Sequence, residues 1–273
     1  MCELIAAIRQ SAGVQAPALI KHLTASGISE WQDLTKARLF DFRDEVMNEV
    51  APTSARTYFA VLKGVLARYE DEEEFCRDYR DILHARKEAP VKTYLTIPEL
   101  KRLEGVETKN ETEVQVLYQF LIGAYTGMRI SDIREVTTEN VRDGSLSYVS
   151  KKTAVHAVVP CNDRVKGYII WVQDNEQDIT LAGYNKAIRR LCKRAGIRDR
   201  VKVYKAGATH TGEKWQYISS HTARISFCTN LAKLHVPLLD ISRMAGHSST
   251  AMTERYVVNT NIELPTSALK YFL

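Results

Sequence analysis

Apolar residues recur at three- and four-residue steps through the first third of the chain. The spacing is clearest in the segments APALIKHLTASG, TKARLFDFRDEVMNEV and TSARTYFAVLKGVLARYE. It places the apolar side chains on one face of a helix, so it predicts amphipathic helices and no strands over residues 1–88. Residues 52–54, Pro-Thr-Ser, are expected to cap the third of these helices.

A charged stretch separates this region from the rest of the chain. Residues 70–74 read EDEEE, and HARKEAPVKTYLT at 84–96 has the charge and proline content of a linker. The length of 273 residues leaves room for two domains. We therefore expect a helical domain at 1–88, a linker at 89–93 and a second domain at 94–273.

The second region mixes helical and strand patterns. TIPELKRLEGV has the signature of a capped helix with proline in its first turn, and TEVQVLYQFLIGAYTG predicts a buried helix that ends at Gly127. LSYVSKKTAVHAVVP contains two β-rich runs around a basic turn, which predicts a hairpin with Lys151 and Lys152 at its tip. KAGATHTGEKWQYISS is expected to be a polar loop.

Helical spacing returns at His221. Pro237 is expected to open one helix and Gly246 to close it, because proline suits the first turn of a helix and glycine the residue after its end. Ser248 to Thr250 are expected to cap a last helix that contains Tyr256.

The charge is distributed unevenly. Residues 1–90 contain 12 basic and 15 acidic residues, whereas residues 91–273 contain 26 and 18, within a net charge of +5. Residues 183–205 hold nine basic residues and one acidic residue. Each lysine or arginine near a phosphate contributes counterion release, so this density points to nucleic acid, although solvated surfaces also carry a mild basic excess. The candidate DNA contacts are Arg56, Lys63 and Arg68 on one helix, Lys151 in the hairpin, and Lys186, Arg189, Arg190, Lys193 and Arg194.

The cysteines and the hydropathy indicate the compartment. Five cysteines at 2, 76, 161, 192 and 228 are odd in number and form no C-x-x-C pair, which argues for a reducing compartment and against a disulfide framework or structural zinc. The N-terminus lacks the features of a signal peptide, and no stretch reaches the ~18 to 20 apolar residues that span a bilayer. We expect a cytoplasmic protein without a membrane contact.

Six residues suit the cleavage and rejoining of DNA. The reaction needs an in-line nucleophile, neutralisation of the developing charge and a proton for the departing 5′ oxygen. A tyrosine can attack, two arginines can clamp the phosphate, a lysine can donate the proton, and histidines can donate hydrogen bonds or take up the phenolic proton. The sequence offers, in order, Arg129, Lys152, His221, Arg224, His247 and Tyr256. Each has an easy structural explanation alone; their order favours a shared site.

This ordered set resembles the signature of the tyrosine recombinases, the family of phage integrases and of the Xer and Cre recombinases. The resemblance covers roughly residues 94–260. TGMRISDI is similar to the family's T-G-x-R-x-(S/G)-(E/D)-(L/I) box, and AGHSSTAMTERYV to its L-G-H-x-x-x-x-T-x-x-Y-x box. The residues Met244-Ala245 depart from the usual leucines before Gly-His, which we expect to affect packing only.

Carried over by position, the resemblance implies a role for each residue. Arg129 and Arg224 would clamp the scissile phosphate, and Lys152 would be the general acid, with Lys151 as the alternative. His221 would act as the base or orient the phosphate, and His247 would donate a hydrogen bond to it. Tyr256 would be the nucleophile that forms a 3′-phosphotyrosine.

The resemblance also implies the fold and the partners. The expected fold is mainly α with a small β-sheet (α+β), a two-domain DNA clamp with a helical core-binding domain and a catalytic domain that ends in a tail at 257–273. The expected partner is double-stranded DNA at recombination sites, bound by a homotetramer on two duplexes, with accessory DNA-bending proteins and association with the nucleoid. Neither cofactor nor metal is expected.

Integration or excision of a phage or mobile element is the expected purpose. Leu264, Leu269, Phe272 and Leu273 of the tail could dock on a neighbouring protomer or pack on their own domain.

Two alternative functions stay open, and several other kinds of site are disfavoured. A DNA-binding architectural protein of the same fold and a relaxing enzyme like the type IB topoisomerases are the alternatives. A zinc site of His221, His235, His247 and Cys228 matches no compact ligand motif. The sequence contains no Walker, G-x-S-x-G or Rossmann fingerprint, so it gives no support to ATPase, hydrolase or dinucleotide chemistry. The histidines at 84, 156, 210 and 235 are expected to be structural or solvent-facing.

Overall fold

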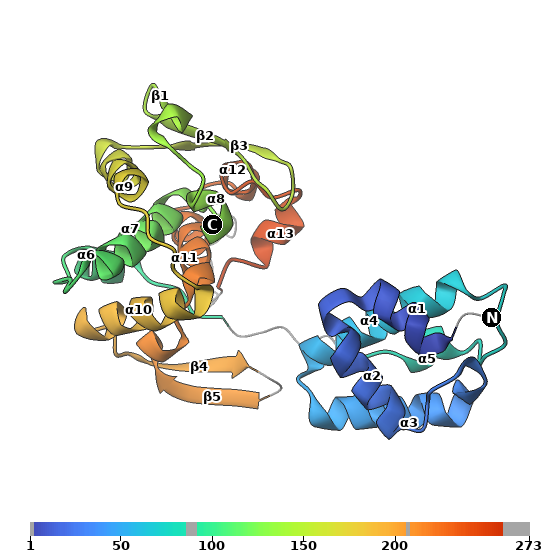
Figure 1. Cartoon of the computed structure of the whole chain (residues 1–273). Helices are drawn as coiled ribbons and strands as arrows, with labels where there is room; N and C mark the ends of the chain where they lie inside the picture. Colours follow the sequence, from blue (N-terminus) through green and yellow to red (C-terminus); the bar gives the residue numbers. More distant parts are fainter. Residues whose placement is uncertain (1–2, 86–91, 206–207, 259–273) are drawn as a thin grey trace, which may run out of the picture. The chain divides into compact units, whose positions relative to one another are not determined.

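The computed structural model describes residues 3–85, 92–205 and 208–258. The chain divides into two compact units near residue 90 (Figure 1). We call them the N-terminal and the C-terminal unit. Most of the predicted linker and all of the tail beyond residue 258, including its four apolar residues, lie outside the described residues.

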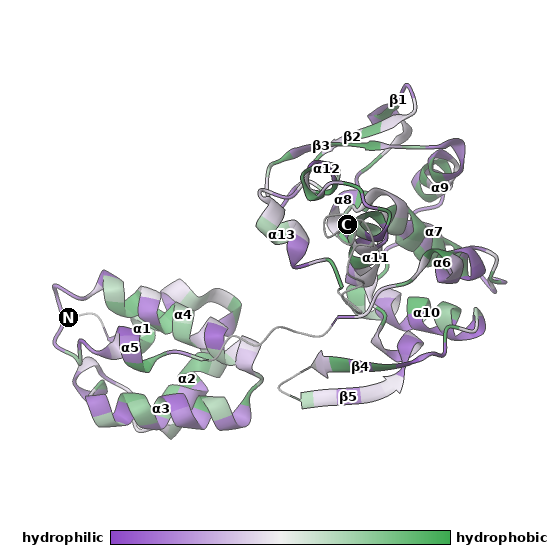
Figure 2. Cartoon of the chain, turned by 180° about the vertical axis from the view of Figure 1, so that it is seen from behind, coloured by the Kyte–Doolittle hydropathy of each residue, from purple (hydrophilic) through white to green (hydrophobic). Residues whose placement is uncertain are grey.

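Between residues 3 and 85, the N-terminal unit contains helices and no strands, as predicted. Apolar side chains of its four longer helices meet in one core. Figure 2 shows hydrophilic and hydrophobic residues alternating along α3, whose Leu39, Phe42 and Val46 are buried. The elements are α1 (Leu4–Ala12), the 3₁₀ helix η1 (Gly13–Gln15), α2 (Ala16–Ala25), the 3₁₀ helix η2 (Trp31–Asp33), α3 (Lys36–Glu49), α4 (Pro52–Arg68) and α5 (Tyr79–Ile82).

The start of α4 differs from the prediction. The N-cap is Ala51, whose side chain cannot cap, and Pro52, Thr53 and Ser54 form the first turn. Proline suits the first helical position because its fixed φ is already helical and its missing N–H would have no partner there. The Pro-Thr-Ser sequence therefore marks the helix start, but it is not the cap.

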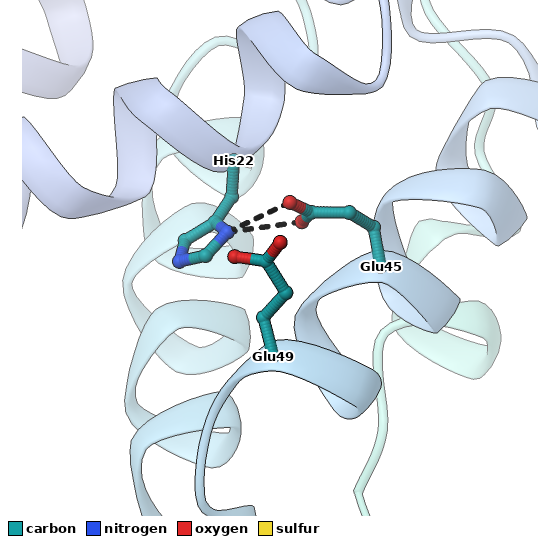
Figure 3. A group of neighbouring side chains, drawn as sticks. All are labelled: His22, Glu45 and Glu49. Carbon is teal, nitrogen blue, oxygen red and sulfur yellow. Dashed lines mark hydrogen bonds and ion pairs between the residues drawn. The ribbon is translucent and has the colours of Figure 1, made fainter.

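A buried histidine ties α2 to α3 (Figure 3). The Nδ1 atom of His22 lies 3.1 and 3.0 Å from the two carboxylate oxygens of Glu45, and Glu49 follows one turn later on α3. Glu49 also pairs with Lys21 at 3.8 Å. Among the described residues, His22, Glu45 and Glu49 form the one group of three whose ligand atoms lie close enough to hold a metal ion. The hydrogen bond and the ion pair account for the group as an interhelical tie.

The C-terminal unit is built around α7. Buried residues of this helix belong to two hydrophobic clusters. One is shared with α6 and α10 and the other with α9 and the strands β2 (Ser145–Val149) and β3 (His156–Pro160), and α11 contributes to both. The helices are α6 (Ile97–Glu104), α7 (Glu111–Thr126), α8 (Ile130–Ile133), η3 (Thr138–Asn140), α9 (Asp163–Asp174), α10 (Leu181–Arg194), η4 (Lys214–Tyr217), α11 (Ser220–Lys233), α12 (Leu238–Met244) and α13 (Thr250–Glu254).

The predicted helix signals are confirmed at α6 and α7. Thr96 and Glu99 form a capping box at the start of α6, and Asn110 caps α7. Gly127 ends α7 at φ +74°. A Cβ at this position would stand 2.5 Å from Cδ1 of Phe227, so both the conformation and the contact require glycine.

The predicted hairpin is also confirmed. The strands β1 (Val141–Arg142), β2 (Ser145–Val149) and β3 (His156–Pro160) form an antiparallel sheet in that order, and Val149 of β2 pairs with His156 of β3. The connection at 150–155 carries both lysines of the basic turn. The sheet lies over the second hydrophobic cluster through residues such as Leu146 and Val159.

A second hairpin was not predicted. The strands β4 (Arg200–Lys205) and β5 (Ala208–Glu213) pair where we expected a polar loop to follow residue 205. Most of β5 is exposed, so its sequence has no alternation of apolar and polar residues. The period that normally indicates a strand is therefore missing, and the prediction of a loop was wrong.

Residues 237–256 have the predicted helix starts and ends, with one exception at Tyr256. Pro237 is the N-cap of α12, Gly246 has φ +63° after its end, and Ser249 is the N-cap of α13. Tyr256 lies two residues beyond α13 rather than within it, although its N–H still bonds to the carbonyl of Thr253 at 2.8 Å.

The thiols and the hydropathy add two facts. The four cysteines that the structure describes are free, and three of them are buried. Within the described residues, none of the helices combines the length and the apolarity that a bilayer-crossing segment requires.

Candidate active site

Arg129 leaves the end of α7 and is fixed by the hairpin. Gly127 turns the chain, and Arg129 follows in extended conformation as the N-cap of α8. Its Nη1 donates to Oγ of Ser150 at 2.7 Å, and Ser150 in turn lies 3.4 Å from the buried carboxylate of Asp132. Asp132 also lies 4.0 Å from Arg129 itself. Nη1, at one edge of the guanidinium, is thus held in place. The position of the Arg129 side chain is set by α8 and by the hairpin together.

Arg224 lies in α11 and is almost completely buried, with an exposed fraction of 1%. Its Nη1 donates to the carbonyl oxygen of Gly127 at 2.8 Å. Its Nε and Nη2 have no hydrogen-bond partner among the described residues. Burial lowers the pKa of this guanidinium, and the nearby Arg129 lowers it further. A buried cation with two unused donors is a site prepared for an anion.

His247 is buried beside Tyr256. Its Nδ1 lies 2.9 Å from Oγ1 of Thr253, while Nε2 has no partner in the described part of the chain. The rings of His247 and Tyr256 are 4.7 Å apart at 36°. Burial, and then the charge of Arg224, lower the pKa of His247 to about 3. The imidazole is therefore neutral, and when the Thr253 hydroxyl donates to Nδ1 the proton lies on Nε2, free to be donated.

His221 lies at the start of α11, and its ring centroid is 5.1 Å from that of Tyr256. Burial lowers its pKa to about 4, helped by the charges of Arg224, Lys92, Arg129 and Lys152 in that order. By accessible surface the residue is nevertheless exposed, so solvent screens these charges. Because its pKa is lowered, His221 is neutral near pH 7 and can accept a proton.

Arg129, His221, Arg224 and Tyr256 line a pocket of about 220 Å³. His247 is not in its lining but packs on the Tyr256 ring. A larger cavity of about 740 Å³ lies in the N-terminal unit, but its lining includes five glutamates, which would repel a phosphate. The smaller pocket is lined by Met128, Arg129, Ile130, Ser131, Lys152, Ser220, His221, Arg224 and Tyr256.

The two hairpin lysines point to different partners. Lys152 lines the pocket. Lys151 forms an ion pair with Glu135, and its backbone N–H donates to Asp132 at 3.2 Å. The hairpin tip is also held by Thr153, whose hydroxyl donates to the carbonyl of Gly246 at 3.1 Å. Of the two lysines, Lys152 is the one that the structure brings to the arginines.

The predicted DNA contacts are spread over three elements. On α10, Lys186, Arg190 and Lys193 are exposed, whereas Arg189 donates to the carbonyl of Ile218 at 2.9 Å. Arg194 forms two hydrogen bonds to the carboxylate of Glu113, at 2.9 and 3.1 Å, so its charge already has a partner.

On α4, Arg56 is exposed, Lys63 reaches the carbonyl of Arg80 at 3.4 Å and Arg68 donates to Ser11 at 3.2 Å. Contact of any of these residues with DNA stays a prediction.

Sequence reasoning missed three residues of the site. Ser150 orients Arg129, and Thr253 orients His247. Ser150 directly precedes the two hairpin lysines and Thr253 lies within the AGHSSTAMTERYV box, so their closeness in sequence to catalytic candidates was an available signal. Lys92 was assigned to the linker, yet its Nζ lies 5.1 Å from the centroid of the Tyr256 ring. No local signal reveals a contact between residues 164 positions apart.

Comparison with known proteins assigns the family. Residues 93–262 match the profile of the phage integrase family, which is well over half of the chain. The chain belongs to the phage integrase family. Its enzyme class is that of the tyrosine-type site-specific recombinases, and DNA recombination is the process in which such enzymes act. A search of curated proteins found no match.

Solved structures confirm the fold class. A lambda integrase (75–356) dimer bound to a COC′ core site is 16% identical, with a TM-score of 0.65, over 94% of this chain and 93% of that one. The Tn1549 transposon integrase in complex with a circular intermediate DNA is 14% identical, with a TM-score of 0.71, over 100% of both chains. The XerH recombinase bound to a palindromic difH substrate is 14% identical, with a TM-score of 0.66, over 94% of this chain and 77% of that one. At these identities the similarity establishes the fold alone.

Proposed function

We propose that this recombinase cleaves and rejoins DNA through a 3′-phosphotyrosine intermediate formed by Tyr256. The observation that carries the proposal is the single pocket in which Tyr256 stands beside two arginines, a lysine and a histidine of the same chain. Since all five come from one chain, the tyrosine acts on a phosphate bound by its own protomer.

Phosphate binding falls to the arginines. Arg224 offers Nε and Nη2, which lack partners among the described residues, and Arg129 is oriented by Ser150. Planar guanidinium groups bind non-bridging phosphate oxygens in pairs and neutralise the charge that develops during attack. The Nε2 atom of His247 supplies a further donor when Thr253 fixes the proton there.

The proton transfers fall to His221 and Lys152. The phenolic oxygen of Tyr256 forms the bond to phosphorus while the bond from phosphorus to the 5′ oxygen breaks. His221 takes the phenolic proton, and Lys152 donates a proton to the 5′ oxygen. The ester keeps the energy of the phosphodiester, so attack by a 5′ hydroxyl reverses each step and rejoins the strand without ATP or a metal.

The proposal extends to the partners. The substrate is a double-stranded recombination site, bound by the C-terminal unit and by residues 1–88 as a core-binding domain, in a homotetramer on two duplexes. One matched structure is a lambda integrase tetramer bound to a Holliday junction. Accessory DNA-bending proteins, action in the cytoplasm at the nucleoid, and integration or excision of a phage or mobile element complete the hypothesis.

The test is the covalent adduct. The protein is incubated, in EDTA and without ATP, with a nicked duplex that carries its recombination site, and the products are separated in denaturing gels. We expect an adduct that is lost in Tyr256→Phe and kept in Tyr217→Phe, a tyrosine outside the pocket. Arg129→Ala and Arg224→Ala should abolish cleavage while much of the DNA binding remains.

An adduct that persists in Tyr256→Phe, or its absence from the wild type, would overturn the mechanism. Strand exchange between two duplexes separates a recombinase from an enzyme that only relaxes supercoils.

A further inference from the structure

The ammonium group of Lys92 lies against the turn that carries Tyr256. Its Nζ donates to the carbonyl oxygen of Arg255, the residue just before the tyrosine, and lies 5.1 Å from the centroid of the Tyr256 ring. Lys92 thus contacts the nucleophile's turn twice, once through the backbone and once through the aromatic ring.

Each contact restrains the phenol in a different way. Carbonyl groups at a helix C-terminus lack partners within the helix, and Arg255 follows the end of α13, so the ammonium supplies a donor where one is missing. A cation over the face of a tyrosine ring is attracted by its quadrupole and opposes rotation of the ring away from it. On the other side of the turn, Thr229 donates to the carbonyl of Tyr256 at 3.2 Å.

The environment of Lys92 fits this function. The side chain is half-buried, and burial lowers its pKa, with the charge of Arg255 as the second cause. Its charge also contributes to the lowered pKa of His221, the group that would accept the phenolic proton. A surface lysine in a linker would have neither property.

We propose that Lys92 is a positioning residue that holds the phenol of Tyr256 in place for attack on the phosphate. The inference rests on the proposed function, in which Tyr256 is the nucleophile. It gives a part in the reaction to a residue at the start of the C-terminal unit, outside both sequence boxes.

The test separates positioning from DNA binding. With enzyme in excess, the rate of adduct formation on a nicked duplex is measured beside the Kd from gel shifts. Lys92→Met keeps the apolar stem and removes both contacts, and we expect its rate to fall at least about tenfold, because the cation–π contact and the charged hydrogen bond both contribute. On this assignment Lys92 acts on the turn of Tyr256 and not on DNA, so its Kd should stay within about twofold.

Two further variants and one control sharpen the result. Lys92→Arg keeps a cation and a donor, so its rate should return to within about threefold of the wild type, and Lys92→Gln, which keeps only the donor, should fall between. Lys233→Met is the matched control, because Lys233 also lies over a tyrosine ring, 5.5 Å from Tyr94. Its rate should stay within about twofold of the wild type.

Failure of this inference differs from failure of the proposed function. If the wild type forms no adduct through Tyr256, the proposed function itself is wrong. If the wild type reacts, the inference on Lys92 is overturned by a Lys92→Met rate equal to the wild type, by a rate loss matched by an equal loss of DNA affinity, or by Lys92→Arg remaining as slow as Lys92→Met.

Discussion

Replacing Arg224 by methionine should stabilise the free protein while it abolishes adduct formation. Arg224 is buried in α11 with two N–H donors that have no partner among the described residues. Each such group costs about 1–3 kcal/mol. Methionine has a similar length and an apolar stem, so it can keep the packing without the charge.

The contacts of Arg224 determine how Arg224→Met changes the free energy of unfolding. Loss of the hydrogen bond from Nη1 to the carbonyl of Gly127 leaves one acceptor unpaired, which costs about 1–3 kcal/mol. Removal of two unpaired donors gains about 2–6 kcal/mol. The repulsion between Arg224 and Arg129 disappears as well. At the middle of both ranges the net gain is about 2 kcal/mol, which corresponds to a rise in Tm of about 4–8 °C for a domain of this size.

The assay is thermal unfolding of the full chain without DNA, with Arg194→Met as the matched control. Arg194 has a carboxylate partner, because it forms two hydrogen bonds with the buried Glu113. The same substitution there leaves the charge of Glu113 unpaired, so it should lower the free energy of unfolding by on the order of 2 kcal/mol and lower Tm accordingly. If Arg224→Met melts at or below the wild-type temperature, the buried guanidinium stabilises the fold and the reasoning is refuted.

Three further predictions follow from the site. Gly127→Ala should lower the free energy of unfolding by about 2 kcal/mol or more, measured by urea unfolding, because its Cβ would stand 2.5 Å from Phe227 in a left-handed conformation; an unchanged midpoint would contradict this. Thr253→Val removes the hydroxyl that lies 2.9 Å from Nδ1 of His247, so adduct formation should slow about tenfold at unchanged Kd, and an unaffected rate would show that the tautomer needs no partner. The pKa values of His247 and His221, about 3 and about 4, lie below the ordinary 6.5. Between pH 6.5 and 4 the unfolded chain therefore binds more protons than the folded one, so Tm should fall as the pH falls through this range. The fall should be less steep in His247→Asn, which lacks one of the two groups.

Local signals predicted the parts of the site that depend on neighbouring residues. The glycine that ends α7 and the turn between β2 and β3 follow from residues within a few positions of each other, so Gly127, Arg129 and Lys152 were expected where the structure has them. The helix starts at α6 and α13 follow in the same way from Thr96 and from the serines at 248–249.

Features that depend on distant partners could not be predicted. The contact of Lys92 with Tyr256 and the pairing of Arg194 with Glu113 join residues far apart in the sequence, and nothing local distinguishes these basic residues from solvated ones. The strand β5 was missed because it is mostly exposed and lacks apolar alternation. Its order comes from pairing with β4, a partner that the sequence of β5 itself does not reveal.

The charges of the site connect phosphate binding to proton transfer. In the free protein, burial lowers the pKa of His221 most, and the charges of Arg224, Arg129 and Lys152 lower it further, which keeps the imidazole neutral but also makes it a weak base. A bound phosphate neutralises these cations, so on the proposed mechanism the pKa of His221 rises when the scissile group arrives. The histidine then accepts the phenolic proton most readily while Tyr256 faces a phosphate, and least readily in the empty pocket. On this mechanism Arg224 has two effects. Its unpaired donors destabilise the free protein, and its charge makes the strength of His221 as a base depend on whether the substrate is bound.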